Sequence, residues 1–163
     1  MEKNTTGLLI GRYQPFHKGH LFILKESLKV LDKLIIAIGS ANIQNDKNPI
    51  SAKNRQKLIE KVIKNEALQD SIQSIVLLDD FPNNDDKWLE HCLGKINNFD
   101  VIVSNDDWVI NIFRNAGFNI LKIPFYKRNV FKGTLIRKEF NEKKPEWKDK
   151  IPNYLINDIK NFL

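Results

Sequence analysis

Short apolar runs alternate along the chain with stretches in which apolar residues recur every three or four positions. The short runs show little polar alternation, which is typical of strands that are covered on both faces of a sheet. They predict strands at Thr6–Gly11, Lys33–Ser40, Ser74–Leu78, Asp100–Ser104 and Asn119–Ile123. The stretches between them predict helices at Gly19–Leu31, Ser51–Asn65, Asp86–Asn97 and Asp106–Ala116.

The alternating order of strands and helices predicts an α/β fold. Right-handed crossovers would join the strands into a single Rossmann-like, doubly wound parallel sheet of about five strands, with helices on both faces. Ser51 is a suitable N-cap for the second helix, and Gly117 is a suitable residue just past the end of the fourth. In such folds ligands bind outside the carboxyl ends of the strands.

The pattern changes after residue 125. A basic loop leads to a short helical stretch at Thr134–Phe140, and a charged segment then leads to a helix from Pro152 to Phe162. We find no repeat, low-complexity tract or linker, so we expect one domain over residues 1–163. Its Rossmann-like core would span residues 1–125, and a C-terminal helical extension would span residues 126–163. The last helix has apolar spacing that suits either a subunit interface or docking on its own domain.

The bulk composition fits a globular domain. With 163 residues, 42% hydrophobic and 28% charged, the chain can bury one substantial core. No apolar run approaches the ~20 residues that a membrane span needs, and the first residues do not resemble a signal peptide, so we expect a cytoplasmic protein with no membrane partner. The single cysteine, Cys92, excludes an intramolecular disulfide framework and a cysteine-rich metal site.

The basic charge is informative mainly through its arginines. The net charge is +6 and the pI is near 9.3, but the lysine excess is spread along the whole chain, and we expect no nucleic-acid partner. Only five of the 26 basic residues are arginines. Because a guanidinium offers phosphate a planar fork that an ammonium lacks, Arg12, Arg55 and Arg137 are candidate phosphate ligands.

The sequence "GRYQPFHKGH", residues 11–20, follows the first predicted strand and opens the first predicted helix. His17 and His20 are three residues apart and would project from one face of a first helical turn. Unpaired backbone N–H groups at such a helix start favour an anion, and Arg12 and Lys18 add positive charge. The combination indicates a site for several phosphates. Alternatively, the two histidines only cap and pack the turn.

A metal site at this turn is disfavoured. No third histidine lies nearby in the sequence, and residues 7–25 contain no carboxylate, whereas metal sites in proteins need three or four such ligands. We therefore expect no metal ligands among these residues.

These residues resemble the phosphate-binding motif of the nucleotidylyltransferase superfamily, whose core is His-x-Gly-His, here "HKGH". The longer form resembles the archaeal type of nicotinamide-nucleotide adenylyltransferase. Three more stretches are similar to motifs of that family and follow in its order: "NPISAKNR" at Asn48–Arg55, "FPNNDDKW" at Phe81–Trp88 and "KGTLIR" at Lys132–Arg137. The resemblance therefore extends through nearly the whole chain.

The resemblance implies a role for each matching residue. His17 and His20 would contact the ATP phosphates, Arg12 would lie beside the reacting phosphates, and Trp88 would stack on the nicotinamide ring. The implied catalytic residues are His17, His20, Arg12 and Arg137. The implied ATP-binding residues are Gly11, Arg12, His17, Gly19, His20, Arg55, Gly133, Thr134 and Arg137, so the C-terminal segment would complete the ATP site. The implied nicotinamide-nucleotide ligands are Arg12, Asn84 and Trp88.

Each of these assignments has a simpler alternative. Arg55 could be a surface residue of an amphipathic helix, Trp88 a core aromatic residue, and "KGTLIR" an ordinary helix start. The motifs also depart from the family pattern. Ile50 and Ser51 replace Phe-Thr, Lys132 replaces a serine and adds charge near the expected triphosphate, and Asn105 replaces a glycine beside the expected adenine.

The implied reaction joins ATP and nicotinamide mononucleotide to give NAD and pyrophosphate, with Mg²⁺ bound mainly through the ATP phosphates. A related adenylyltransferase acting on nicotinic acid mononucleotide, pantetheine phosphate or flavin mononucleotide is the main alternative, and a catalytically weak NAD-binding sensor is another. The resemblance also implies a homo-oligomer, for which a hexamer is one candidate.

Overall fold

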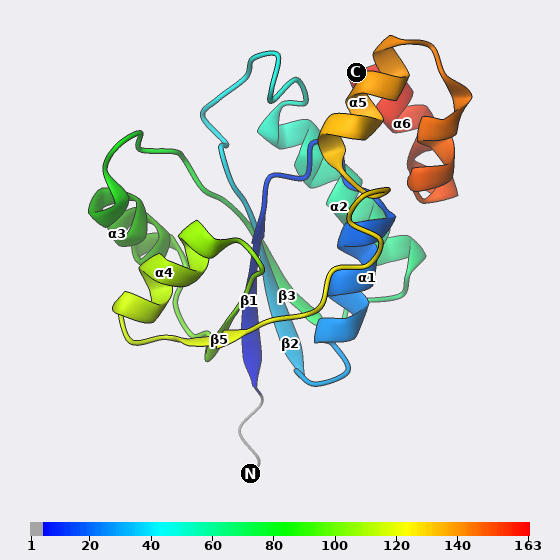
Figure 1. The fold of residues 1–163 in the computed structure, drawn as a ribbon. Helices are drawn as coiled ribbons and strands as arrows, with labels where there is room; N and C mark the ends of the chain where they lie inside the picture. Colours follow the sequence, from blue (N-terminus) through cyan, green and yellow to red (C-terminus); the bar gives the residue numbers. More distant parts are fainter. Residues whose placement is uncertain (1–4) are drawn as a thin grey trace.

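The computed structural model describes residues 5–163, and their strands form a five-stranded parallel sheet (Figure 1). The strands are β1 (Thr6–Gly11), β2 (Lys33–Ile38), β3 (Ile72–Leu77), β4 (Val101–Val103) and β5 (Asn119–Leu121), in the order β3-β2-β1-β4-β5. The chain builds outward from β1 to β3 and then crosses to the other side of β1. The predicted doubly wound sheet is confirmed, and its topological switch point lies between β1 and β4.

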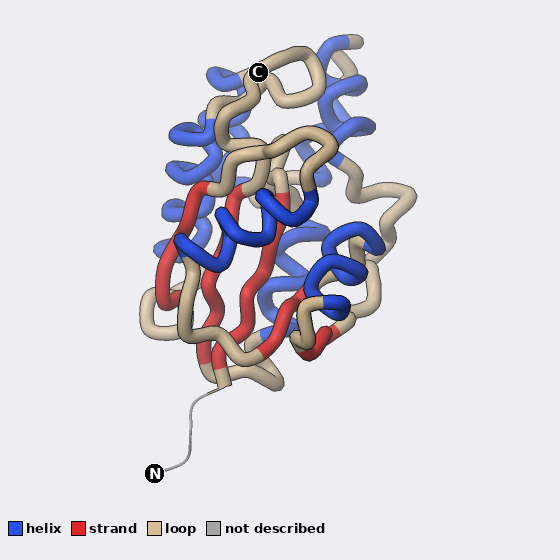
Figure 2. Tube along the Cα trace, turned by 90° about the vertical axis from the view of Figure 1, so that its left-hand side faces the viewer, coloured by secondary structure: helices blue, strands red, loops and turns tan. Residues whose placement is uncertain are grey.

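Helices cover both faces of this sheet. They are α1 (Lys18–Ser27) and α2 (Ala52–Asn65) on one face and α3 (Asp85–Lys95) and α4 (Asp107–Asn115) on the other (Figures 1 and 2). Leu9 and Ile36 belong to the core on the α1 and α2 side, whereas their neighbours Leu8 and Ile35 belong to the core on the α3 and α4 side. Because successive residues of a strand enter opposite cores, the strands have continuous apolar runs.

The helix ends follow their expected chemistry. The Ser51 hydroxyl accepts a hydrogen bond from the Asn54 N–H at 3.2 Å, and Gly117 adopts a φ of +87° just beyond α4. The first helix ends at Ser27, earlier than predicted, because the chain turns there and the Asp32 N–H bonds to the carbonyl of Thr5 before β2. Strands β4 and β5 are shorter than predicted, with three residues each.

The C-terminal segment consists of α5 (Gly133–Asn141), the short 3₁₀ helices η1 (Pro145–Lys150) and η2 (Asn153–Leu155), and α6 (Ile156–Phe162). The helix predicted from Pro152 therefore begins with a 3₁₀ turn. Leu155 and Ile159 are fully buried in the core that includes α2 residues. Lys61 of α2 pairs with Asp158 at 2.6 Å. Of the two alternatives for the last helix, the structure has it docked on its own domain, beside α2 (Figure 1).

Within residues 5–163, no helix combines the length and the apolar character that would be needed to cross a bilayer.

Candidate active site

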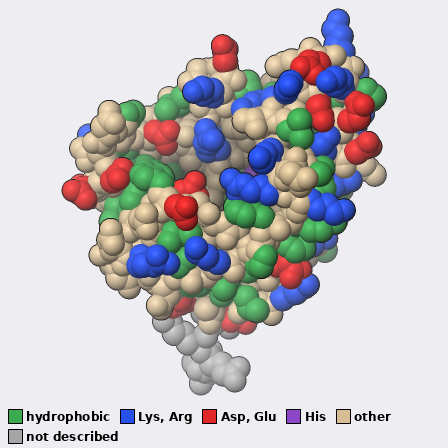
Figure 3. Space-filling view, viewed as in Figure 1, with side chains coloured by type: hydrophobic (Ala, Val, Ile, Leu, Met, Phe, Trp, Pro, Cys, Tyr) green, Lys and Arg blue, Asp and Glu red, His purple; other side chains and the backbone are tan. Residues whose placement is uncertain are grey.

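Two large hollows open at the carboxyl edge of the sheet, and they differ in charge. The first, of about 460 Å³, is called the basic pocket, and its charged and imidazole lining is Arg12, His17, His20, Arg128, Lys132 and Arg137. The second, of about 640 Å³, is called the acidic pocket, and its charged and indole lining is Arg12, Asp80, Asp85, Trp88, Asp106 and Trp108. In Figure 3, basic side chains gather toward α5, and acidic and apolar side chains gather over α3 and α4.

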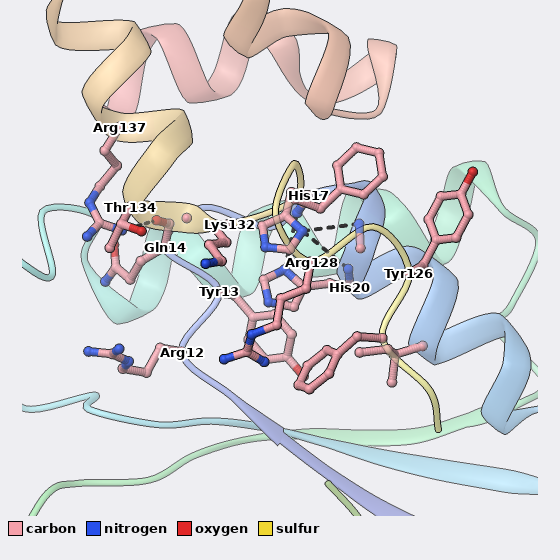
Figure 4. Close-up of a pocket in the computed structure, with 15 residues that line it drawn as sticks. Arg12, Tyr13, Gln14, His17, His20, Tyr126, Arg128, Lys132, Thr134 and Arg137 are labelled. Atoms are coloured by element: carbon pink, nitrogen blue, oxygen red, sulfur yellow. Dashed lines mark hydrogen bonds between the residues drawn. The ribbon is translucent and has the colours of Figure 1, made fainter. Parts of the chain in front are cut away.

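The two histidines form a reciprocal cap at the start of α1. The Gly19 and His20 N–H groups donate to His17 Nδ1 at 3.1 and 3.3 Å, and the His17 N–H donates to His20 Nδ1 at 3.2 Å. The rings stack with their centroids 3.7 Å apart (Figure 4). Because each Nδ1 accepts a backbone hydrogen bond, this network assigns the proton of each neutral imidazole to Nε2. Both rings can then donate from Nε2 to an anion.

Burial keeps both imidazoles uncharged near neutral pH. It lowers the pKa of His17 to about 4, and burial together with the neighbouring His17 lowers the pKa of His20 well below its usual value. The sequence suggested that backbone N–H groups at this helix start would be free to bind an anion. Those of Gly19 and His20 are not free, because His17 accepts a hydrogen bond from both. The capping interpretation is therefore confirmed. Anion binding by the two rings stays a prediction, and it is compatible with the cap because the Nε2–H groups take no part in capping.

Gly19 is needed for this packing. A Cβ at that position would lie 2.9 Å from the Cβ of Phe131 and 3.0 Å from the His17 ring, closer than side chains normally approach. The absence of a side chain thus lets the 125–132 segment close over the histidine pair (Figure 4).

The opposite wall of the basic pocket is the start of α5. Arg137 donates from its guanidinium to the carbonyl of Gln14 at 2.5 Å, and a Cβ at Gly133 would lie 2.7 Å from that same carbonyl. Burial, and then the charge of Arg12, lowers the pKa of Arg137. Thr134 and Lys132 are exposed and line the pocket, so the extra lysine contributes charge to it.

Arg55 lies behind the two pockets and lines neither. Its side chain is fully buried and donates four hydrogen bonds to backbone carbonyls, those of Ile50, Arg12, Gly39 and Ser40, at 2.7 to 3.1 Å. Burial lowers its pKa to about 10, so it stays charged. Direct contact with a triphosphate finds no support in this geometry, since Arg55 uses its donors to join the loops after β1 and β2.

An aromatic corner forms one end of the acidic pocket. Trp88 is 3% exposed and packs against Phe113, so it belongs to the core and also borders the pocket. Trp108 is 44% exposed, and its ring centroid lies 4.6 Å from that of Trp88 with 55° between the planes. Asn84 accepts the Lys87 N–H at 3.0 Å as the N-cap of α3 and does not line the pocket, whereas Asn83 does.

A smaller hollow of about 170 Å³ lies between the two pockets, at the switch point of the sheet. It is lined by the ends of β1 and β4, including Gly11, Ser104 and Asn105. The Asn105 amide donates to the Ile123 carbonyl, so this side chain is directed along the sheet edge toward β5.

Several site residues were missed by the sequence reasoning. Asp85 and Asp106 are among them, although Asp85 lies within "FPNNDDKW" and Asp106 opens a predicted helix. Arg128 was hidden in the basic loop "FYKRNVFKG", whose mixture of basic and aromatic residues was the available signal. Trp108 was assigned only to a helix, and Asp80, whose carboxylate accepts from Ser40 at 2.7 Å, follows a strand without a recognised motif. Among residues 5–163, no three His, Cys, Asp or Glu side chains gather in a metal-binding arrangement.

The comparisons with known proteins agree with these observations. A family model described as cytidylyltransferase-like matches residues 8–139. The nicotinamide-nucleotide adenylyltransferase of Archaeoglobus fulgidus is 34% identical over 155 residues, which cover 93% of this chain and 88% of that protein. The protein of the same name from Methanosarcina mazei is 31% identical, over 97% of this chain and 89% of its own length.

Solved structures show the same similarity. A bifunctional NMN adenylyltransferase/ADP ribose pyrophosphatase from Francisella tularensis, complexed with AMP and a Mn ion, matches with a TM-score of 0.71 and 28% identity. The match covers 91% of this chain but only 44% of that longer protein. A second structure of the same bifunctional protein matches with a TM-score of 0.75.

Proposed function

The chain belongs to the cytidylyltransferase-like family and, within it, to the nicotinamide-nucleotide adenylyltransferases of archaeal type, and on this basis we propose that it makes NAD and pyrophosphate from ATP and nicotinamide mononucleotide. The observation that carries this proposal is the meeting of two pockets of opposite charge at a single residue, Arg12. One pocket suits a polyanion, and the other suits a flat cationic ring. A reaction that joins a triphosphate to a pyridinium nucleotide needs both.

The basic pocket supplies charge without supplying a base. The 5′-phosphate oxygen of the mononucleotide forms a new bond to the α-phosphorus of ATP, and the bond from that phosphorus to the bridging oxygen breaks with its electron pair leaving on pyrophosphate. The attacking oxygen is already anionic near neutral pH, so no proton has to be removed. The task of the protein is to align the two anions and to stabilise the charge on the leaving group.

The histidines and basic residues can share that task. His17 and His20, held as neutral Nε2–H donors, would contact the ATP phosphates, and Arg137 and Lys132 would approach them from the start of α5. Neutral donors can hydrogen-bond both the phosphates of ATP and the pyrophosphate product, because the reaction does not require them to release a proton at any step. Arg12, at the junction, would bridge the attacking phosphate and the phosphate under attack.

Arg55 fits a positioning role in this scheme. Its four hydrogen bonds fix the backbone at Arg12, Gly39 and Ser40 relative to the backbone at Ile50, just before α2. Trp88 would contact the nicotinamide ring from the core side of the acidic pocket, and Asn84 would act indirectly, through the start of α3.

The residues present fit a divalent cation that arrives with ATP. Among residues 5–163, the basic pocket is lined by donors and cations and by no carboxylate, so Mg²⁺ would be held by the phosphates and water. It would neutralise charge on the β- and γ-phosphates.

The test is direct. Purified protein with Mg-ATP and nicotinamide mononucleotide should form NAD and pyrophosphate, measured by coupled alcohol dehydrogenase and by phosphate release after pyrophosphatase. Nicotinic acid mononucleotide, pantetheine phosphate and flavin mononucleotide should be tried in parallel, and product from one of these alone would replace the proposal. Tight NAD binding without turnover, unchanged in His20→Ala, would indicate a sensor.

Two further properties are proposed on the same family basis. We expect a cytoplasmic enzyme that forms a homo-oligomer, with a hexamer as the first candidate. Because the apolar face of the C-terminal helix is docked on its own domain, only its outer face, with Asn157, Lys160 and Asn161, would be available to a subunit interface. Sedimentation of the purified protein measures the assembly.

A further inference from the structure

Trp108 lies at the second residue of α4 and turns an exposed indole toward the acidic pocket. Large exposed apolar side chains are few in residues 5–163, and most of the others lie away from this pocket. The indole N–H of Trp108 donates to the Oδ1 atom of Asp85 at 3.1 Å. This bond ties the first turn of α4 to the first turn of α3 and fixes the ring while its face stays accessible.

Trp88 and Trp108 together form two sides of an aromatic corner. Their ring centroids are 4.6 Å apart and their planes are inclined by 55°, so the rings present different faces to the same space. The Trp88 ring is almost fully buried, which leaves little of its surface for a ligand, whereas nearly half of the Trp108 residue is accessible. A flat ligand that enters this pocket would therefore find most of its aromatic contact on Trp108.

The charged side chains that line the pocket beside the corner are mainly carboxylates. Asp80, Asp85 and Asp106 line the pocket, and Arg12 is its one lining cation and lies at the junction with the basic pocket, where the phosphate of the ligand would lie. Aromatic faces attract cations, and the attraction is stronger in a site that excludes water. Three carboxylates disfavour an anionic substituent on the same ring by like-charge repulsion.

We propose that the Trp108–Asp85 pair is a specificity determinant that selects a cationic pyridinium ring with an uncharged substituent over a ring that bears a carboxylate. Trp108 is the contact surface, and Asp85 both holds the indole and repels the carboxylate. The inference rests on the proposed function. It assigns the choice between nicotinamide and nicotinic acid mononucleotide to Trp108, which lies outside the family motifs described above, together with Asp85, which lies within "FPNNDDKW".

Steady-state kinetics of four variants test the pair, with both mononucleotides and saturating Mg-ATP. Trp108→Leu should raise KM for both mononucleotides about fivefold or more, because both rings are pyridinium cations and both lose the cation–π contact. Trp108→Phe keeps a ring but loses the N–H donor, so its effect should be smaller. Asp85→Asn keeps an acceptor and removes the charge, and it should lower KM for the acid relative to the amide by about threefold or more.

Asp86→Asn is the matched control. Asp86 lies beside Asp85 in the same first turn of α3, carries the same charge and does not line the pocket. This variant should keep the wild-type ratio of the two KM values. Calorimetric titration of nicotinamide mononucleotide into wild type and Trp108→Leu, without ATP, measures the same contact independently of turnover.

The outcomes distinguish a failure of the proposed function from a failure of the specificity inference. No NAD from the wild-type protein would refute the proposed function. Wild-type activity together with an unchanged KM for nicotinamide mononucleotide in Trp108→Leu, or an unchanged ratio of the two KM values in Asp85→Asn, would overturn the specificity inference alone. A fall in kcat with unchanged KM values would likewise assign Trp108 a purely structural role.

Discussion

The basic and acidic pockets are built from the same sheet edge but by opposite means. In the basic pocket, function depends on donors whose geometry is fixed by the backbone: the two imidazoles are oriented by N–H groups, and Arg137 is anchored on the Gln14 carbonyl. In the acidic pocket, the shape comes from side chains packed on one another, Trp88 against Phe113 and Trp108 against Trp88. The basic pocket would recognise an anion through the direction of its hydrogen-bond donors. The acidic pocket would recognise a ring through the aromatic contact area and the negative charge around it.

The largest effect of a substitution is expected at Arg55, because its hydrogen bonds hold the loops that line both pockets. Arg55→Met would leave four buried or partly buried carbonyls without their donor, so the free energy of unfolding should fall by about 3 kcal/mol or more. Urea titration followed by circular dichroism measures this. Lys57→Met, an exposed position on the same helix, is the control and should change stability little. Wild-type stability of Arg55→Met would refute the positioning role.

The next largest effect is expected for a substitution that changes the basic pocket and leaves the acidic pocket intact. His20→Ala removes one charge-stabilising donor from the basic pocket, and kcat should fall roughly ten- to a hundredfold, since a hydrogen bond to a charged group contributes about 1.5 to 3 kcal/mol. KM for the mononucleotide should change much less, because the acidic pocket is intact. His91→Gln is the control, since His91 accepts the Asp79 N–H far from the histidine pair and glutamine can still accept. An equal loss of kcat in both variants would contradict the assignment.

The two pockets differ in how much of each could be predicted from the sequence. The parallel sheet and the cap at Ser51 were predictable, because periodicity and capping are local properties of the chain. The histidine pair was predictable as well, since His17 and His20 lie within one turn. The family assignment and the implied reaction also agree with the comparisons.

The remaining features depend on distances that sequence does not contain. The Arg55 guanidinium looks like a phosphate ligand in a one-dimensional motif, and only the fold reveals that four carbonyls surround it. Trp108 joins Asp85 across 23 positions, and nothing local predicts that pair. Arg128 reaches the basic pocket because residues 125–132 fold back over α1. The contacts of the predicted site residues with substrates stay predictions.

A pH titration tests the neutral state of the histidines. Because the pKa of His17 is about 4 in the folded chain and near 6.5 in the unfolded chain, the unfolded state binds more protons between these values. Stability is therefore fully present above pH 6.5 and is lost as the pH falls toward 4. From pH 7 to pH 5 the loss through His17 should be about 2 kcal/mol, and the lowered pKa of His20 adds to it.

His17→Asn isolates this contribution. Asparagine is a good N-cap that does not titrate, so its free energy of unfolding should fall less between pH 7 and pH 5 than that of the wild-type protein. Urea titrations at the two pH values measure the difference. A parallel loss in both proteins would contradict the lowered pKa of His17 in the folded state.

The smallest effect is expected at Lys132, where a substitution tests whether an exposed charge at the rim of the basic pocket contributes to ATP binding. Lys132 is exposed, and solvent screens an exposed charge, so Lys132→Ser should raise KM for ATP only about two- to fivefold. The rise should shrink as salt increases from 0.05 to about 0.5 M, because the Debye length falls well below the width of the pocket. KM for the mononucleotide should not change, since Lys132 does not line the acidic pocket. Lys138→Ser removes an exposed charge from the same helix outside the pocket, and an equal effect there would show that general surface charge, and not the position of Lys132, attracts the triphosphate.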